Sequence, residues 1–71
     1  METLKLREKD EYITLGQLLK ATGKVENGAE AKEVINAGEV TVNGETEKRR
    51  GRKLRDGDVA EFDGTEIKVV R

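Results

Sequence analysis

An Asn-Gly pair at positions 43 and 44 is the feature that most restricts how this chain can fold. A two-residue type I′ turn needs positive φ at both central positions, and Asn followed by Gly adopts that conformation at little cost. Before the pair, residues 39–42 alternate polar and apolar side chains, as a half-buried strand does. After it, residues 45–47 can form a polar return strand. The pattern predicts a β-hairpin and therefore a sheet with antiparallel neighbours.

Other short strands are predicted on both sides of this hairpin. Residues 59–62 and 65–70 are apolar-rich, and Asp63-Gly64 supplies a turn between them. Asp56-Gly57 supplies another turn before the first of the two. Near the N-terminus, residues 3–7 alternate, which predicts a strand with Leu4 and Leu6 facing inward.

Two helices are predicted between the N-terminal strand and the hairpin. Thr14 and Gln17 have the spacing of a capping box, and Gly23 is a typical helix stop. Asn27 can cap a second helix, with Glu30 at the spacing of a variant box, and Gly38 can end it. The side chains expected to be buried are Leu15, Leu18 and Leu19 in the first helix, and Ala31, Val34 and Ile35 in the second.

These elements predict one α+β domain over residues 1–71. We expect two short antiparallel helices packed on a small antiparallel sheet. Only 34% of the residues are apolar, so the core must be small. Phe62 is expected in that core, and Tyr12 in a half-buried supporting position.

A basic run at residues 48–55 concentrates the positive charge of the chain. The chain has 14 Lys+Arg against 15 Asp+Glu, yet no acidic residue interrupts this run. Like charges packed so closely repel one another unless an anion lies opposite them. Gly51, inside the run, would let backbone N–H groups approach an anion. The run predicts a phosphate-binding edge, or else a solvated loop neutralised by nearby carboxylates. Its cations are Lys48, Arg49, Arg50, Arg52, Lys53 and Arg55.

The composition argues against several other functions. The chain has no His, Cys or Ser, which removes the usual nucleophiles and the usual neutral-pH base, so we expect no enzyme and no cofactor. We also expect no metal site, because a calcium loop starting at Asp56 would place Glu61 and Ile67 where Gly and Glu are needed. No apolar run approaches the length of a membrane span, and we expect a cytoplasmic protein without membrane contact.

Several of these segments together resemble a known family. Residues 31–44, with Val40-Thr41-Val42-Asn43-Gly44 at their end, are similar to the core of the RNA-binding domain named after ribosomal small-subunit protein four, the S-four domain or alpha-L motif. Gly57-Asp58-Val59 resembles that family's Gly-Asp before its last strands. Residues 13–20 and 49–54 are more similar to its small stand-alone bacterial members. The resemblance covers residues 12–63.

The resemblance implies two antiparallel helices on a small sheet and the binding of structured RNA. Ribosomal RNA is expected before transfer RNA, on the ribosome or during its assembly, with ribosomal proteins as further possible partners and the chain itself a monomer. The residues implied at the site are Arg49, Arg50, Arg52 and Lys53 in the basic run, with Lys48 and Arg55 flanking them, and Lys32 on the second helix.

Two details of this implied site are open. Many family members have Ser-Arg where this chain has Asn27-Gly28, which removes a cation but leaves backbone amides that could contact a phosphate. Lys20 and Lys24 could lie beside the basic run together with Lys32, or all three could be ordinary surface lysines.

The alternative to RNA binding is a protein-interaction module. In it the basic run would dock on an acidic protein, and an exposed sheet edge could add a strand from that partner. A third reading is a small catalyst that uses Lys and carboxylates, which would require a lysine with a strongly displaced pKa in a pocket. With one Tyr and one Phe, the chain lacks an aromatic platform for single strands, so folded RNA read by its backbone and shape is preferred.

Overall fold

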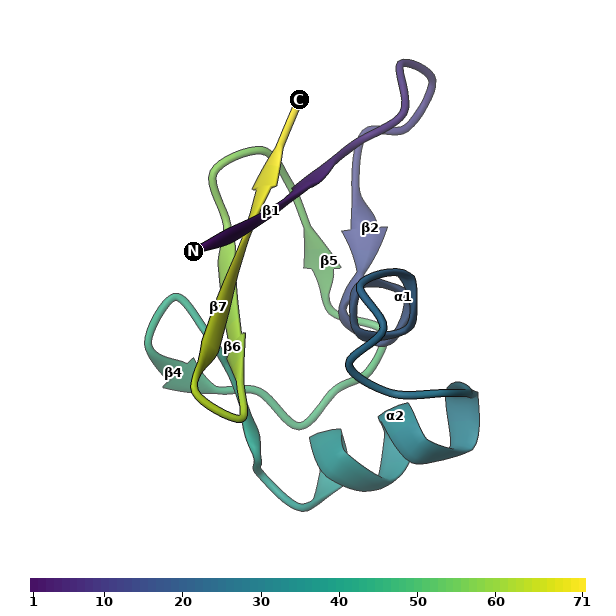
Figure 1. Ribbon diagram of the computed structural model, residues 1–71, viewed down its shortest axis with the longest axis vertical. Coiled ribbons are helices and arrows are strands. Elements are labelled where there is room, and N and C mark those ends of the chain that lie inside the picture. The colour runs from purple at the N-terminus through teal and green to yellow at the C-terminus, as the bar shows by residue number, and fades with distance from the viewer.

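The computed structural model covers residues 1–71 and contains two helices, a five-stranded sheet and a two-stranded sheet (Figure 1). The elements in chain order are β1 (Glu2–Lys5), β2 (Ile13–Thr14), α1 (Leu15–Ala21), α2 (Gly28–Asn36), β3 (Val40–Val42), β4 (Glu45–Thr46), β5 (Lys53–Leu54), β6 (Val59–Phe62) and β7 (Thr65–Val70). This arrangement confirms the predicted α+β class. Neither helix is long and apolar enough to cross a membrane.

The five-stranded sheet has the order β1-β7-β6-β3-β4 and is mixed. Its β3–β4, β3–β6 and β6–β7 pairs are antiparallel as predicted, but β1 pairs with β7 in parallel, with Leu4 opposite Val69. The prediction of a purely antiparallel sheet was therefore wrong at this edge. Because β1 and β7 lie at opposite ends of the chain, no turn motif between them reveals their relative direction.

The Asn43-Gly44 hairpin is confirmed, with φ of 52° and 87° at the two positions. The Asn43 side chain has a second role that the sequence did not reveal. Its amide nitrogen donates to Asp58 Oδ1 at 3.1 Å, and its oxygen accepts from the Val59 backbone N–H at 2.9 Å. Asn43 of the Asn-Gly motif thus contacts Asp58 of the Gly-Asp motif, and this contact fixes the hairpin to the start of β6.

Both predicted helix caps are present. Thr14 Oγ1 accepts from the Gln17 N–H at 3.4 Å, while Gln17 Oε1 accepts from the Thr14 N–H at 3.3 Å. Asn27 Oδ1 accepts from the Glu30 N–H at 2.9 Å. The Glu30 carboxylate reaches back one residue further than a capping box requires and accepts from the Glu26 N–H at 2.7 Å.

The two helices are neighbours but cross one another. Figure 1 shows α1 nearly end-on and α2 from the side, which differs from the expected antiparallel pair. Helix α1 has only seven residues, so its packing is decided by a single buried face. The crossing directs Leu15, Leu18 and Leu19 of α1 and Ile35 of α2 into one core that is shared with the sheet.

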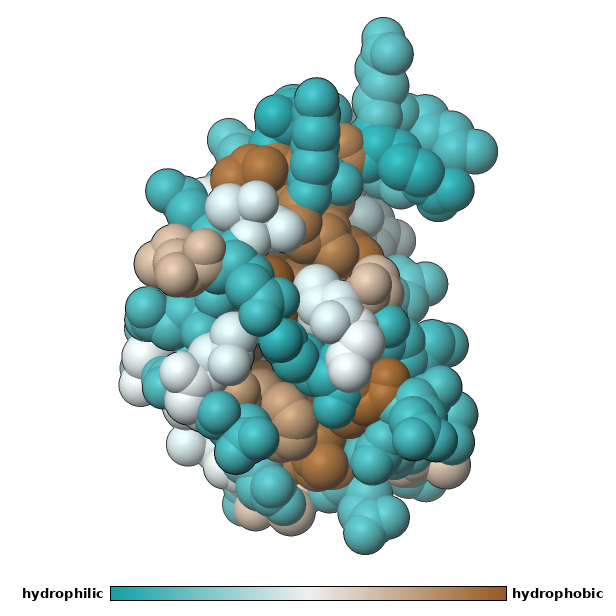
Figure 2. Space-filling model, in the orientation of Figure 1, coloured by the Kyte–Doolittle hydropathy of each residue, from teal (hydrophilic) through white to brown (hydrophobic).

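The core consists of 13 buried apolar residues drawn from both helices, both sheets and two connecting segments. Phe62 and Val34 are only partly buried and pack against it, so the prediction placed Phe62 too deep. Figure 2 shows a surface on which hydrophilic side chains predominate and apolar groups appear mainly in the furrows between them. The buried set is Leu6, Leu15, Leu18, Leu19, Val25, Ala31, Ile35, Val40, Val42, Leu54, Ala60, Ile67 and Val69.

Candidate nucleic-acid interface

The basic run, residues 48–55, is fixed to the start of α1 by backbone hydrogen bonds. The β2–β5 pair places Lys53 opposite Thr14. Beyond this pair, the Leu15 N–H donates to the Arg52 carbonyl and the Gly16 N–H donates to the Arg50 carbonyl, both at 2.9 Å. These are first-turn amides of α1, which have no partner inside the helix. The cations of the run are therefore presented on a defined backbone beside α1.

A buried carboxylate organises two of these cations. Glu47 is 7% exposed, and its Oε2 accepts from Arg49 Nε at 2.9 Å and from the Arg49 backbone N–H at 3.1 Å. Its Oε1 accepts from Arg49 Nη2 at 3.1 Å and from Arg52 Nη1 at 2.7 Å. The side-chain hydrogen bonds from Arg49 have the largest effect, followed by the bond from Arg52. Together they outweigh the effect of burial and lower the Glu47 pKa to about 2. The same contact raises the pKa of Arg49.

Sequence reasoning treated Glu47 only as part of a polar return strand. The one available signal was its position, as the last acidic residue directly before six cations in eight positions. The pairing leaves the two arginines in different states. The Arg49 side chain is still 74% exposed and can offer its remaining N–H groups to an external anion, whereas the Arg52 side chain is 35% exposed.

Tyr12 lies under two further cations of the run. Lys53 Nζ is 5.0 Å from the centroid of its ring, and Arg55 Cζ is 5.7 Å from it. Both distances fall within the range of a cation–π contact. Tyr12 is 38% exposed and supports these cations from the surface, which agrees with the predicted half-buried supporting position. The ring limits where the long Lys53 and Arg55 side chains can point.

Two arginines of the run, Arg50 and Arg55, make no ion pair with a carboxylate, and of these only Arg55 lies over the Tyr12 ring. Arg50 borders a small hollow of about 230 Å³ between the two helices, and Lys20, which also makes no ion pair, lies on the same rim. Lys48 is likewise free of ion pairs, and its side chain passes over Gly38. The hollow is lined by Thr14, Gly16, Gln17 and Lys20, by Gly28 and Ala31 of α2, and by Arg50 and Gly51.

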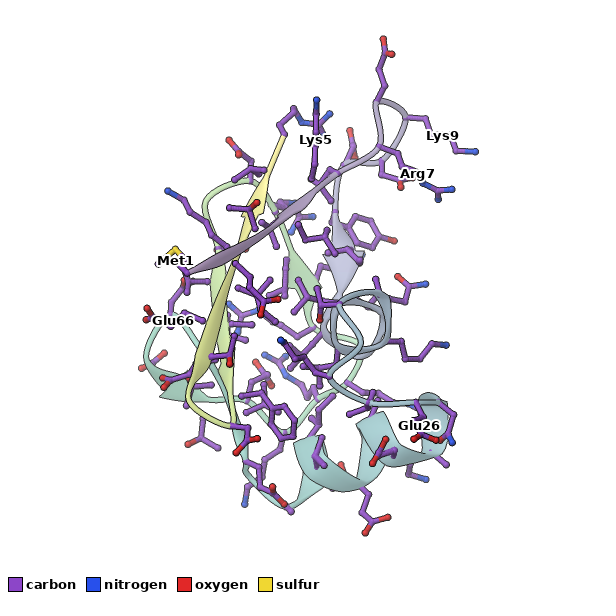
Figure 3. The ribbon with its side chains drawn as sticks, in the orientation of Figure 1. Met1, Lys5, Arg7, Lys9, Glu26 and Glu66 are labelled. Atoms are coloured by element: carbon purple, nitrogen blue, oxygen red, sulfur yellow. The ribbon has the colours of Figure 1, made fainter.

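The other cations proposed from the sequence are placed differently. Lys24 Nζ binds Glu2 at 2.6 Å, so its charge is directed toward the N-terminal strand. Lys32 is exposed on α2 and does not line the hollow. Figure 3 shows Lys5, Arg7 and Lys9 at the opposite end of the molecule from Glu26, which lies just before α2. The structure thus brings Lys20 and Arg50 together and leaves Lys24 and Lys32 outside that pair.

The Glu47 contact predicts a distinct loss of stability in acid. The Glu47 pKa is lowered from its ordinary 4.5 to about 2, so the stabilisation is complete above pH 4.5 and disappears as the pH falls toward 2. Glu47→Gln removes the titrating group and should flatten the pH dependence across this window while lowering stability at pH 7. Urea unfolding of both proteins from pH 2 to 7 measures this. Parallel curves for the two proteins would show that Glu47 contributes nothing to the acid dependence.

Comparisons with known proteins agree with this geometry. The chain matches the S4 domain family over residues 4–70. It is 50% identical over 54 residues, 76% of each chain, to a protein of Bacillus subtilis (strain 168) named probable ribosome maturation protein RlbA. It is 39% identical over 62 residues, 87% of this chain and 89% of the other, to the putative RNA-binding protein YbcJ of Escherichia coli (strain K12).

A solved structure extends the similarity to three dimensions. The solution structure of YbcJ from E. coli superposes with a TM-score of 0.75 and 38% identity, and the match covers all of this chain and 89% of that one. That structure is described as containing an alpha-L motif involved in RNA binding. The similarity therefore extends over the helices, the sheet and the basic run together.

Proposed function

The chain belongs to the S4 domain family, and we propose that it is a non-catalytic RNA-binding module for structured RNA, with ribosomal RNA as its target. We assign the whole of residues 1–71 to this one module. The observation that carries the proposal is the basic run, held on the start of α1 by backbone hydrogen bonds to the Arg50 and Arg52 carbonyls. A charged run held in one conformation loses less side-chain and loop entropy on binding than a mobile one.

The arrangement of the cations favours phosphate as the anion. Glu47 orients the exposed Arg49 guanidinium, Tyr12 supports Lys53 and Arg55, and Arg50 is free of any carboxylate. Arginine binds phosphate oxygens through two parallel N–H groups, and lysine binds them as a point charge. Several cations spaced along one backbone segment match a polymer of phosphates better than a single small anion. We assign phosphate contacts to Arg49, Arg50, Arg52, Lys53, Lys48, Arg55 and Lys20. We assign Lys32 and Lys24 to the margin of this RNA-binding surface.

The choice of ribosomal RNA rests on the relatives. The B. subtilis protein at 50% identity is named for ribosome maturation, and the E. coli protein for RNA binding. We therefore propose that this chain contacts ribosomal RNA and its neighbouring ribosomal proteins, and we further propose that it does so as a cytoplasmic monomer. The surface offers one exposed aromatic ring, Tyr12, which suits recognition of RNA shape and backbone better than stacking of successive single-stranded bases.

The experiment that tests the proposal is fluorescence-anisotropy binding of the native chain to ribosomal RNA fragments, transfer RNA and duplex DNA at one salt concentration. We expect a structured ribosomal RNA fragment to bind tightest. A pull-down from lysate, with and without ribonuclease, is the companion measurement. Absence of RNA binding, combined with capture of acidic proteins that ribonuclease does not affect, would replace this proposal with a protein-docking function for the same basic run.

A further inference from the structure

Two of the glycines in this fold, Gly28 and Gly51, face open space and have no positive φ. Gly23, Gly38, Gly44, Gly57 and Gly64 adopt positive φ, and a Cβ on Gly16 would make an ordinary van der Waals contact with the Arg50 carbonyl oxygen at 3.5 Å. Gly28 and Gly51 lie outside the left-handed region, and a Cβ on either would meet no atom within 4 Å. Gly28 is also the first residue of α2, and glycine is a poor helix former. Within the protein, alanine would fit both positions.

These two glycines line the same hollow between α1 and α2. They come from different parts of the chain, Gly28 from α2 and Gly51 from the basic run. A glycine that faces open space keeps room for something outside, since it lets a ligand approach the backbone closely. The shared location indicates that this space is needed by one bound group.

The rim of the hollow identifies the chemistry of that group. Lys20 and Arg50 both border it without a carboxylate partner. Gln17 borders it as well, and because its oxygen accepts from the Thr14 N–H, its amide N–H groups remain available as donors. Two cations and a neutral donor match an anionic oxygen-rich group. Ala31 is the single apolar residue of the lining, so the hollow lacks the stacking surface that a nucleobase would use.

We propose that the hollow receives one phosphate of the RNA backbone together with its ribose, with the phosphate held between Lys20 and Arg50 and the ribose against Gly28 and Gly51. This inference rests on the proposed RNA-binding function and makes it more specific. It turns Gly28 and Gly51, which carry no charge, into determinants of affinity. It also separates the hollow from the rest of the basic run, which lines a second concavity of about 550 Å³ formed by Arg49, Gly51, Arg52, Lys53 and Arg55.

Filling the hollow with an apolar side chain tests this proposal. Gly28→Leu should lower the affinity for the best-binding ribosomal RNA fragment by about tenfold or more, because one charged hydrogen-bonded contact is lost. The magnitude of the salt slope should fall by about 1. Ala29→Leu is the matched control, since Ala29 is the next residue of the same helix, is exposed and does not line the hollow. It should bind as the native chain does. Gly28→Ala and Gly51→Ala should give smaller losses with an unchanged or higher melting temperature.

A double variant distinguishes a filled hollow from a general disturbance. Lys20→Gln alone should weaken binding, but in the Gly28→Leu protein it should have little further effect, because the phosphate is already displaced. If Gly28→Leu binds like the native chain with the same salt slope, the hollow is not occupied, while the proposed RNA-binding function stands. If the native chain binds no RNA at all, both the proposed function and this inference fall.

Discussion

Changing Lys20, Arg50 and Lys53 together to Gln should lower the affinity for structured RNA by about a hundredfold or more. None of the three side chains contacts Glu47, so the buried carboxylate keeps both of its arginine partners. Each lost cation removes a charged hydrogen bond to phosphate and the release of a counterion. Anisotropy titrations against the best-binding ribosomal RNA fragment measure the loss. Variants of Arg49 or Arg52 would be less informative, because they also disturb the fold around Glu47.

A control with the same net charge separates location from overall charge. Lys5, Lys9 and Lys68 are exposed, lie outside the basic run and do not line the hollow. Their triple replacement by Gln changes the net charge by the same amount, so it should reduce affinity only slightly through long-range attraction. Equal losses in the two triple variants would mean that the chain attracts RNA by its overall charge and has no defined binding surface.

Ile35→Ala should lower the free energy of unfolding by about 2–5 kcal/mol. Ile35 is fully buried in a core of 13 residues, so the lost methyl groups leave a cavity that few neighbours can fill. A domain of this size has only a small margin of stability, and the variant could be largely unfolded at room temperature. Urea denaturation followed by circular dichroism measures the change.

The conservative change at the same position provides the control for Ile35→Ala. Ile35→Val removes one methylene and should cost about 0.5–1.5 kcal/mol. A stable Ile35→Ala protein, within error of the native chain, would contradict the packing of α2 described above.

The features that the sequence predicted correctly depend on residues close together in the chain. The Thr14–Gln17 box, the Asn27 cap and the Asn43-Gly44 turn each involve partners within three positions, so the local pattern was sufficient. The buried faces of the helices followed from their period in the same way. The α+β class followed because it combines the predicted helices and strands in one domain.

The features that escaped prediction depend on contacts between distant segments. The parallel β1–β7 pair joins the two ends of the chain, and the cations over Tyr12 come from more than 40 positions away. The hollow needs both helices and the basic run together. Glu47 is the exception, because its arginine partners are close in sequence. Its burial depends on the fold, however, and burial is what distinguishes it from the chain's other acidic residues.

The structure also divides the basic run into cations with different tasks. Arg49 and Arg52 hold Glu47, Lys53 and Arg55 lie over Tyr12, and Arg50 faces the hollow without a carboxylate partner. The sequence alone did not distinguish the roles of these cations from one another. Single substitutions along the run should therefore have different effects. Replacing Arg52 should lower the stability of the fold, whereas replacing Arg50 should weaken RNA binding.

Phosphate binding by the basic run is tested most directly by the salt dependence of RNA binding by the native chain. If four to six phosphates are neutralised by the basic run and its neighbours, log K should fall linearly with log salt at a slope of roughly −3 to −5. The structured ribosomal RNA fragment that binds best is the ligand for this measurement. A slope in that range supports a phosphate-binding surface of the size described. A flat response would contradict it, because binding would then not depend on the cations that this fold brings together.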